Sequence, residues 1–228
     1  MPKSKMKDID FIAFDLDGTL LDTAKDFFQA VNILRFNNKL GPCKYEDVRS
    51  RVSEGALSLV KLALDLKESE KEAIEINRKQ LLEIYRECCL DLTTPFEGIY
   101  SLLEKINNSN LNWGIVTNKP LAFAEKIVDH FFLDYEPKCL ICPEHTGNRK
   151  PSPKGLIKAI DQLNSNPKNT VYVGDHLIDI QAGKRAKTYT IAASYGYIPK
   201  GHNCLEWEAD FIAKNPLEIV EFIPSLSK

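Results

Sequence analysis

Three aspartates follow an apolar run near the start of the chain. The run IDFIAF at 9–14 leads into Asp15, and Asp17 and Asp22 stand on either side of a Gly-Thr pair. Asp15 and Asp17 are two residues apart, so their side chains project to the same side if strand geometry persists. Two acidic groups at ~4 Å repel by roughly 4 kcal/mol at an effective dielectric of 20, so such a cluster needs a cation or a bound proton.

Complementary polar residues stand at three later points of the chain. Thr117 ends the run NWGIVT and Asn118 follows it, Lys150 precedes a helical pattern at 153–164, and Asp175 and Asp179 follow the run TVYVG. In an open parallel sheet, ligands bind beyond the carboxyl ends of the strands, so we expect these residues to meet there. Clustered carboxylates form an oxygen-only ligand set that fits a hard cation, Mg²⁺.

This set of residues predicts phosphoryl transfer through a covalent intermediate. Asp15 attacks phosphorus and forms an aspartyl-phosphate, which water then breaks. Asp17 protonates the leaving alcohol and later deprotonates the water. Thr117 and Lys150 offer a hydroxyl and a positive charge to the phosphoryl oxygens.

The elements that must position these residues alternate between strand and helix. Strands are predicted at 9–14, 112–117, 139–141, 170–174, 189–193 and 210–213, and helices at 98–107, 120–132, 153–164 and 178–187. The strands are short, rich in β-branched residues and without polar alternation, as expected when both faces are buried. This order predicts right-handed βαβ units and an α/β fold with a doubly wound parallel sheet.

Residues 23–91 interrupt this alternation. They carry only helical patterns, at 23–38, 54–66 and 68–89. The simplest interpretation is a helical domain inserted after the first strand, with a core formed by 1–22 and 92–228.

Composition limits the partners of the chain. Its 228 residues hold 30 Lys and Arg against 32 Asp and Glu, a formal net charge of -2, so no broad basic field is available for nucleic acid or an anionic membrane. The N-terminal MPKSKMK is basic, but the apolar run after it is short and interrupted by aspartates, which predicts neither a signal peptide nor a membrane span. We therefore expect a cytoplasmic protein, as a monomer or homodimer.

Four segments of the chain resemble phosphatases of the haloacid dehalogenase superfamily. They are FDLDGTLLDT at 14–23, IVTNKP at 115–120, RKPSP at 149–153 and VGDHLIDIQAG at 173–183. The resemblance implies a Rossmann-like core with a helical cap inserted after the first strand. It assigns Asp15 as nucleophile, Asp17 as acid/base and backbone ligand of Mg²⁺, Thr117 and Lys150 as a phosphoryl clamp, and Asp175 and Asp179 as metal ligands.

Within the superfamily the chain looks most like phosphoglycolate phosphatases, through VTNKP, PFEGIYSLL and ASYGY. Its cap segment RVSEGALSLV at 51–60 departs from their pattern and looks like that of the related N-acetylmuramic acid 6-phosphate phosphatases. Both kinds of substrate carry a carboxylate besides the phosphate. We hypothesise that Arg51 or Arg49 binds that carboxylate, with Thr117, Asn118 and Lys150 on the phosphate side.

The expected activity is therefore Mg²⁺-dependent hydrolysis of a small phosphorylated metabolite. The alternatives are a phosphatase for N-acetylmuramic acid 6-phosphate or another sugar phosphate, and a phosphomutase that uses the same aspartyl-phosphate. A further alternative, from another class, is a regulatory module that binds phosphate without turnover. Dehalogenation is disfavoured because a leaving halide needs neither a proton nor a metal.

Overall fold

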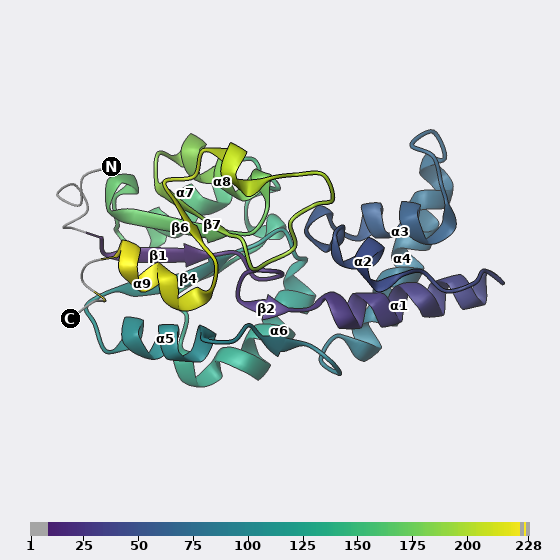
Figure 1. Ribbon diagram of the computed structural model, residues 1–228, viewed down its shortest axis with the longest axis horizontal. Helices are drawn as coiled ribbons and strands as arrows, with labels where there is room; N and C mark the ends of the chain where they lie inside the picture. Colours follow the sequence, from purple (N-terminus) through teal and green to yellow (C-terminus); the bar gives the residue numbers. More distant parts are fainter. Residues whose placement is uncertain (1–8, 224–225, 227–228) are drawn as a thin grey trace.

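The computed structural model describes residues 9–223 and residue 226, so the basic segment at the N-terminus lies outside the described residues. Figure 1 shows a core built around a sheet, with a group of helices, α1 to α4, standing to one side of it. Within the described residues, no helix combines the length and the apolar composition needed to span a membrane.

A six-stranded parallel sheet forms the centre of the core. Its strands are, in spatial order, β5 (Leu140–Ile141), β4 (Asn112–Val116), β1 (Phe11–Phe14), β6 (Thr170–Gly174), β7 (Tyr189–Ala193) and β8 (Phe211–Ala213). Phe14 pairs with Ile115 on one side and with Val173 on the other, so β1, β4 and β6 end at the same edge. The predicted strands and the parallel arrangement are confirmed.

Helices cover both faces of this sheet (Figure 1). They are α7 (Lys154–Gln162) and α8 (Leu177–Ala186) on one face, and α5 (Ile99–Asn107), α6 (Leu121–Phe132) and α9 (Ile219–Phe222) on the other. Phe11 and Ala13 of β1 pack in the cluster with α7, whereas Ile12 and Phe14 pack in the larger cluster with α5 and α6. This alternation explains why the first strand is apolar throughout, since each face of the sheet needs its own core.

The cap consists of the helices between two short strands. They are α1 (Ala24–Asn37), α2 (Tyr45–Arg49), α3 (Ala56–Leu64) and α4 (Lys71–Cys88), with a single 3-10 turn at Val52–Glu54. The flanking strands β2 (Leu21–Asp22) and β3 (Thr94–Pro95) pair antiparallel, so the chain leaves and re-enters the core at one place. The five-residue helix α2 was not among the predicted elements, because one turn gives too few residues for a periodic pattern.

A buried carboxylate fastens the two ends of the cap to each other. Asp26 of α1 is fully buried and accepts hydrogen bonds from the backbone N–H of Leu92, at 2.8 Å, and of Thr93, at 3.0 Å. The hydroxyl of Thr93 donates a third, at 2.6 Å. These bonds satisfy a carboxylate that would be costly to bury alone, and they hold the start of the cap beside its end.

Candidate active site

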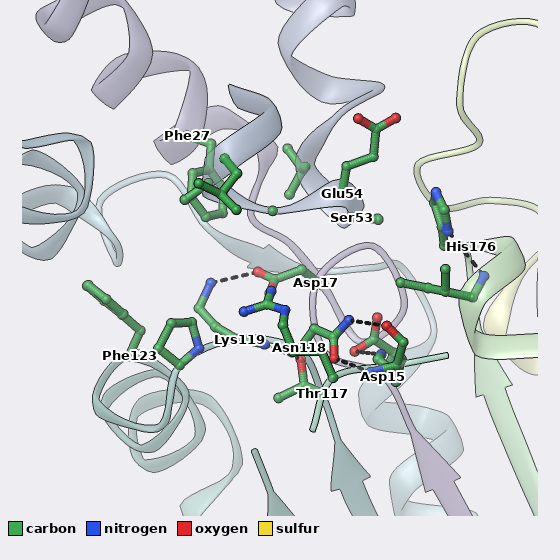
Figure 2. A pocket seen from close by; sticks show the side chains of 18 of the residues that line it. Asp15, Asp17, Phe27, Ser53, Glu54, Thr117, Asn118, Lys119, Phe123 and His176 are labelled. Atoms are coloured by element: carbon green, nitrogen blue, oxygen red, sulfur yellow. Dashed lines mark hydrogen bonds and ion pairs between the residues drawn. The ribbon is translucent and has the colours of Figure 1, made fainter. Parts of the chain in front are cut away.

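A cavity of about 450 Å³ lies between the cap and the strand ends of the core. Figure 2 shows Asp15, Thr117 and Asn118 on the core side of this cavity, with Ser53 and Glu54 of the cap across from them. Small-molecule sites typically have volumes of roughly 300–1,000 Å³, so there is room for more than a phosphate group.

At the floor of the cavity a buried lysine lies between two carboxylates. The Nζ of Lys150 is 2.7 Å from Oδ1 of Asp15 and 2.7 Å from Oδ1 of Asp179. All three residues are buried. Asp15 follows β1 directly and Asp179 stands in the first turn of α8, so the parallel sheet brings together residues that are far apart in sequence.

Asp175 completes a group of three aspartates. Its carboxylate accepts hydrogen bonds from the hydroxyls of Thr19 and Ser53, each at 3.0 Å, and from the backbone N–H of Tyr197 at 2.8 Å. Ser53 belongs to the cap, so one of these bonds joins the cap directly to the carboxylate cluster.

Burial makes the negative charges of this cluster costly. It raises the pKa of Asp15 to about 6, although the charge of Lys150 opposes the shift. It also raises the pKa of Asp175 to about 8, and the neighbouring charges of Asp15 and Asp179 add to the increase. Each shift means that the protein disfavours the ionised carboxylate relative to its protonated form.

The donor set of the cluster fits a divalent cation. One oxygen from each of Asp15, Asp175 and Asp179 lies within 4.8 Å of the others. When all three carboxylates are ionised, one ammonium leaves two negative charges, which a divalent ion would balance. Oxygen-only ligands are those of hard cations such as Mg²⁺ and Ca²⁺.

Asp17 points away from this cluster. Its Oδ1 accepts a hydrogen bond from the hydroxyl of Thr23 at 2.6 Å and lies 2.8 Å from the Nζ of Lys119 (Figure 2). Lys119 also donates to the hydroxyl of Tyr85 at 2.9 Å, and Tyr85 belongs to α4 of the cap. The ring of Tyr85 stacks on Phe27 with centroids 3.9 Å apart. The prediction that Asp17 is a metal ligand through its backbone stays a prediction.

Lys119 is a site residue that the sequence analysis missed. It lies in the motif IVTNKP, but an isolated lysine beside a helix-starting proline carries no chemical signal of its own. Its role depends on a partner 102 residues away in the chain, Asp17, which only the fold reveals.

Thr117 and Asn118 both line the cavity, at the end of β4. The side chain of Asn118 is already engaged, because its Oδ1 accepts from the backbone N–H of Lys150 at 2.7 Å and its Nδ2 donates to the Lys150 carbonyl at 3.2 Å. Asn118 therefore holds the backbone of Lys150 in place. The hydroxyl of Thr117 accepts from the backbone N–H of Lys119 and remains able to donate to a ligand.

The arginines predicted to bind a substrate carboxylate do not line the cavity. The guanidinium of Arg49 donates to the Gly196 carbonyl at 2.9 Å and lies 4.9 Å from the ring centroid of Tyr197. Arg51 is likewise absent from the cavity wall, which instead includes Arg78 of α4 and Arg149 of the core. The reason is local: the turn at Val52–Glu54 brings Ser53 and Glu54, and not the arginines before them, to the cavity.

The fold and the site define a phosphatase of the haloacid dehalogenase type. The sequence profile of the haloacid dehalogenase-like hydrolases matches residues 12–193, and the chain belongs to this family. A crystal structure of a predicted phosphoglycolate phosphatase from Haemophilus somnus superimposes with a TM-score of 0.84 over 95% of this chain and 98% of that one, at 23% identity.

The chain is similar to curated phosphatases of two kinds. The N-acetylmuramic acid 6-phosphate phosphatases of Pseudomonas aeruginosa and Pseudomonas putida are 39% and 40% identical, and the matches cover 93% and 94% of this chain and 93% and 96% of those proteins. The phosphoglycolate phosphatase of Xylella fastidiosa is 32% identical, over 90% of this chain and 89% of that protein.

A divalent cation, tested as Mg²⁺, is expected to stabilise the folded protein because it offsets the charge of the aspartate cluster. At a hundred times its Kd it contributes about 2.7 kcal/mol, which for a chain of this size raises Tm by roughly 5–10 °C relative to EDTA. In Asp179→Asn, which removes one of the three carboxylates, a smaller shift is expected at the same Mg²⁺ concentration.

The matched control is Asp129→Asn, which changes an exposed aspartate of α6 outside the cavity wall and should keep the full shift. Thermal unfolding with and without Mg²⁺ is the measurement. Equal shifts in all three proteins would show that Mg²⁺ binds elsewhere.

Proposed function

We propose that this phosphatase hydrolyses N-acetylmuramic acid 6-phosphate in a Mg²⁺-dependent reaction with an aspartyl-phosphate intermediate on Asp15. The observation that carries the chemistry is the placement of Asp15, directly after the central strand, against Lys150 at the cavity floor, 2.7 Å away. Oδ1 of Asp15 is buried, and its contact within the described residues is the ion pair with Lys150, which holds the carboxylate at the cavity floor.

The first chemical step transfers the phosphoryl group to the protein. A carboxylate oxygen of Asp15 forms a bond to phosphorus while the bond from phosphorus to the ester oxygen breaks. The leaving oxygen takes a proton from Asp17. Oδ1 of Asp17 is held by Lys119 and Thr23, which leaves Oδ2 to carry that proton.

The second step restores the carboxylate. A water molecule gives its proton to Asp17 and attacks phosphorus, the bond to Asp15 breaks, and inorganic phosphate is released. Lys150 and the hydroxyl of Thr117 hold phosphoryl oxygens through both steps. Asp15, Asp175 and Asp179, with the backbone carbonyl of Asp17, would hold a Mg²⁺ ion, which would supply positive charge to the phosphoryl group.

Three observations support the choice of substrate. The relatives named for N-acetylmuramic acid 6-phosphate are 39% and 40% identical to this chain over almost its whole length, against 32% for the phosphoglycolate phosphatase of Xylella fastidiosa. The cap turn at 53–55, which faces the cavity, carries Ser-Glu-Gly, the feature by which the sequence departs from phosphoglycolate phosphatases. The cavity is also larger than a two-carbon substrate requires.

Phosphate release from N-acetylmuramic acid 6-phosphate and from 2-phosphoglycolate, with and without Mg²⁺, tests this proposal. The expected result is a kcat/KM at least about tenfold higher for the sugar phosphate, a difference of ~1.4 kcal/mol in transition-state binding. Release of inorganic phosphate, without an isomerised sugar phosphate, separates hydrolysis from mutase activity. A higher kcat/KM for 2-phosphoglycolate would contradict the proposal.

Lys119→Met is expected to lower kcat by at least about tenfold with little change in KM, because Asp17 loses the cation that holds it and acid–base catalysis contributes roughly 10²–10⁴. Lys126→Met is the matched control, since Lys126 is an exposed lysine of α6 outside the cavity wall. Steady-state kinetics on one substrate gives both parameters. A wild-type kcat in Lys119→Met would mean that this lysine does not position Asp17.

A further inference from the structure

Four permanently basic side chains line the cavity: Arg78, Lys119, Arg149 and Lys150. Three of them have carboxylate partners. Lys150 contacts Asp15 and Asp179, Lys119 contacts Asp17, and Arg78 donates two hydrogen bonds to Glu75, at 2.6 and 2.9 Å. Within the described part of the chain, the guanidinium of Arg149 has no ion pair and no hydrogen bond.

Arg149 lies where the core meets the cap. It directly precedes Lys150, whose side chain is buried at the cavity floor, whereas the side chain of Arg149 is exposed at the cavity wall. Its Nη2 lies 3.3 Å from the place where a Cβ on Gly55 would stand. The guanidinium therefore faces the cap turn at 53–55, at a point where glycine leaves space for it.

The surroundings of Arg149 favour an anion. Burial lowers the pKa of the guanidinium, the charge of Glu144 raises it, and the positive charge of Arg78 has a smaller lowering effect. An arginine remains protonated at neutral pH even so. A carboxylate that met this guanidinium would relieve the repulsion from Arg78 and could accept two parallel hydrogen bonds.

We propose that Arg149 and the cap turn at 53–55 form a subsite for a carboxylate on the leaving group of the substrate. The inference rests on the proposed function, because N-acetylmuramic acid carries a lactyl ether whose carboxylate is ionised at neutral pH. Arg149 and Lys150 are neighbours in sequence and bind different parts of the substrate in this proposal. Lys150 binds the phosphoryl group at the cavity floor, and Arg149 binds the carboxylate near the cap. This assignment replaces Arg51, which does not line the cavity.

N-acetylglucosamine 6-phosphate provides the matched substrate, since it is the same sugar phosphate without the lactyl ether. The measurement is kcat/KM for both substrates in the wild type, Arg149→Gln, Arg149→Lys and Arg51→Gln, with thermal unfolding to confirm that each variant is folded. The wild type should prefer N-acetylmuramic acid 6-phosphate. In Arg149→Gln that preference should fall about tenfold to a hundredfold, the range expected for charge-assisted hydrogen bonds, and Arg149→Lys should restore part of it.

The comparison separates this inference from the proposed function. A wild type that does not distinguish the two sugars would overturn the proposed substrate, and the subsite with it. A wild-type preference that survives in Arg149→Gln would overturn the subsite alone. Equal losses on both substrates would assign Arg149 to the phosphoryl group, and a lost preference in Arg51→Gln instead would assign the carboxylate to Arg51; either result contradicts the proposal.

Discussion

The structure depends on a confined cluster of like charges. Asp15, Asp175 and Asp179 place carboxylate oxygens within 4.8 Å of one another in a buried site, and among the described residues only Lys150 brings an opposite charge into contact with them. Repulsion between carboxylates at such distances reaches roughly 4 kcal/mol per pair at an effective dielectric of 20. A site with this excess of negative charge favours binding of a divalent cation. The cation and Lys150 together would then attract phosphoryl oxygens.

The fold holds the cluster together against this repulsion. The parallel sheet brings the ends of β1 and β6 to one edge, and Asn118 fixes the backbone of Lys150 from the end of β4. Close packing behind the cluster leaves no room for adjustment, because a side chain on Gly18, which has φ +85°, would collide with the carboxylate of Asp175. The backbone N–H of Tyr197 secures the same carboxylate from behind.

The cap is connected to the site by polar contacts as well as by packing. Ser53 donates to Asp175, Tyr85 accepts from Lys119, and Arg49 donates to the Gly196 carbonyl. The first of these contacts reaches the aspartate cluster, and the second reaches Lys119, the partner of Asp17. A shift of the cap relative to the core would therefore alter contacts both at the aspartate cluster and at Asp17. In the proposed function, one inserted domain would in this way contact the leaving group and also influence the chemistry.

The sequence predicted the parts of the structure that local patterns encode. Apolar runs located the strands, and aspartates at their ends predicted the cluster of Asp15, Asp175 and Asp179 with Lys150. The cap residues that line the cavity were harder to predict from the sequence. A helical pattern shows which face of a helix is apolar, but not which side chain faces a distant cavity. Arg51 stands next to the turn at 53–55 in the sequence but does not line the cavity, whereas Arg149 reaches that turn from the core across almost a hundred residues. Lys119 was missed for the same reason.

The central claim is that Asp15 becomes phosphorylated during turnover. Wild-type protein mixed with N-acetylmuramic acid 6-phosphate and Mg²⁺, and quenched in acid within milliseconds, should contain a phosphoryl group on the peptide that includes Asp15 when its peptides are weighed by mass spectrometry. Asp15→Asn should show neither the modified peptide nor turnover. A phosphoryl group on another residue, or an Asp15→Asn protein that hydrolyses the substrate at the wild-type rate, would contradict the account.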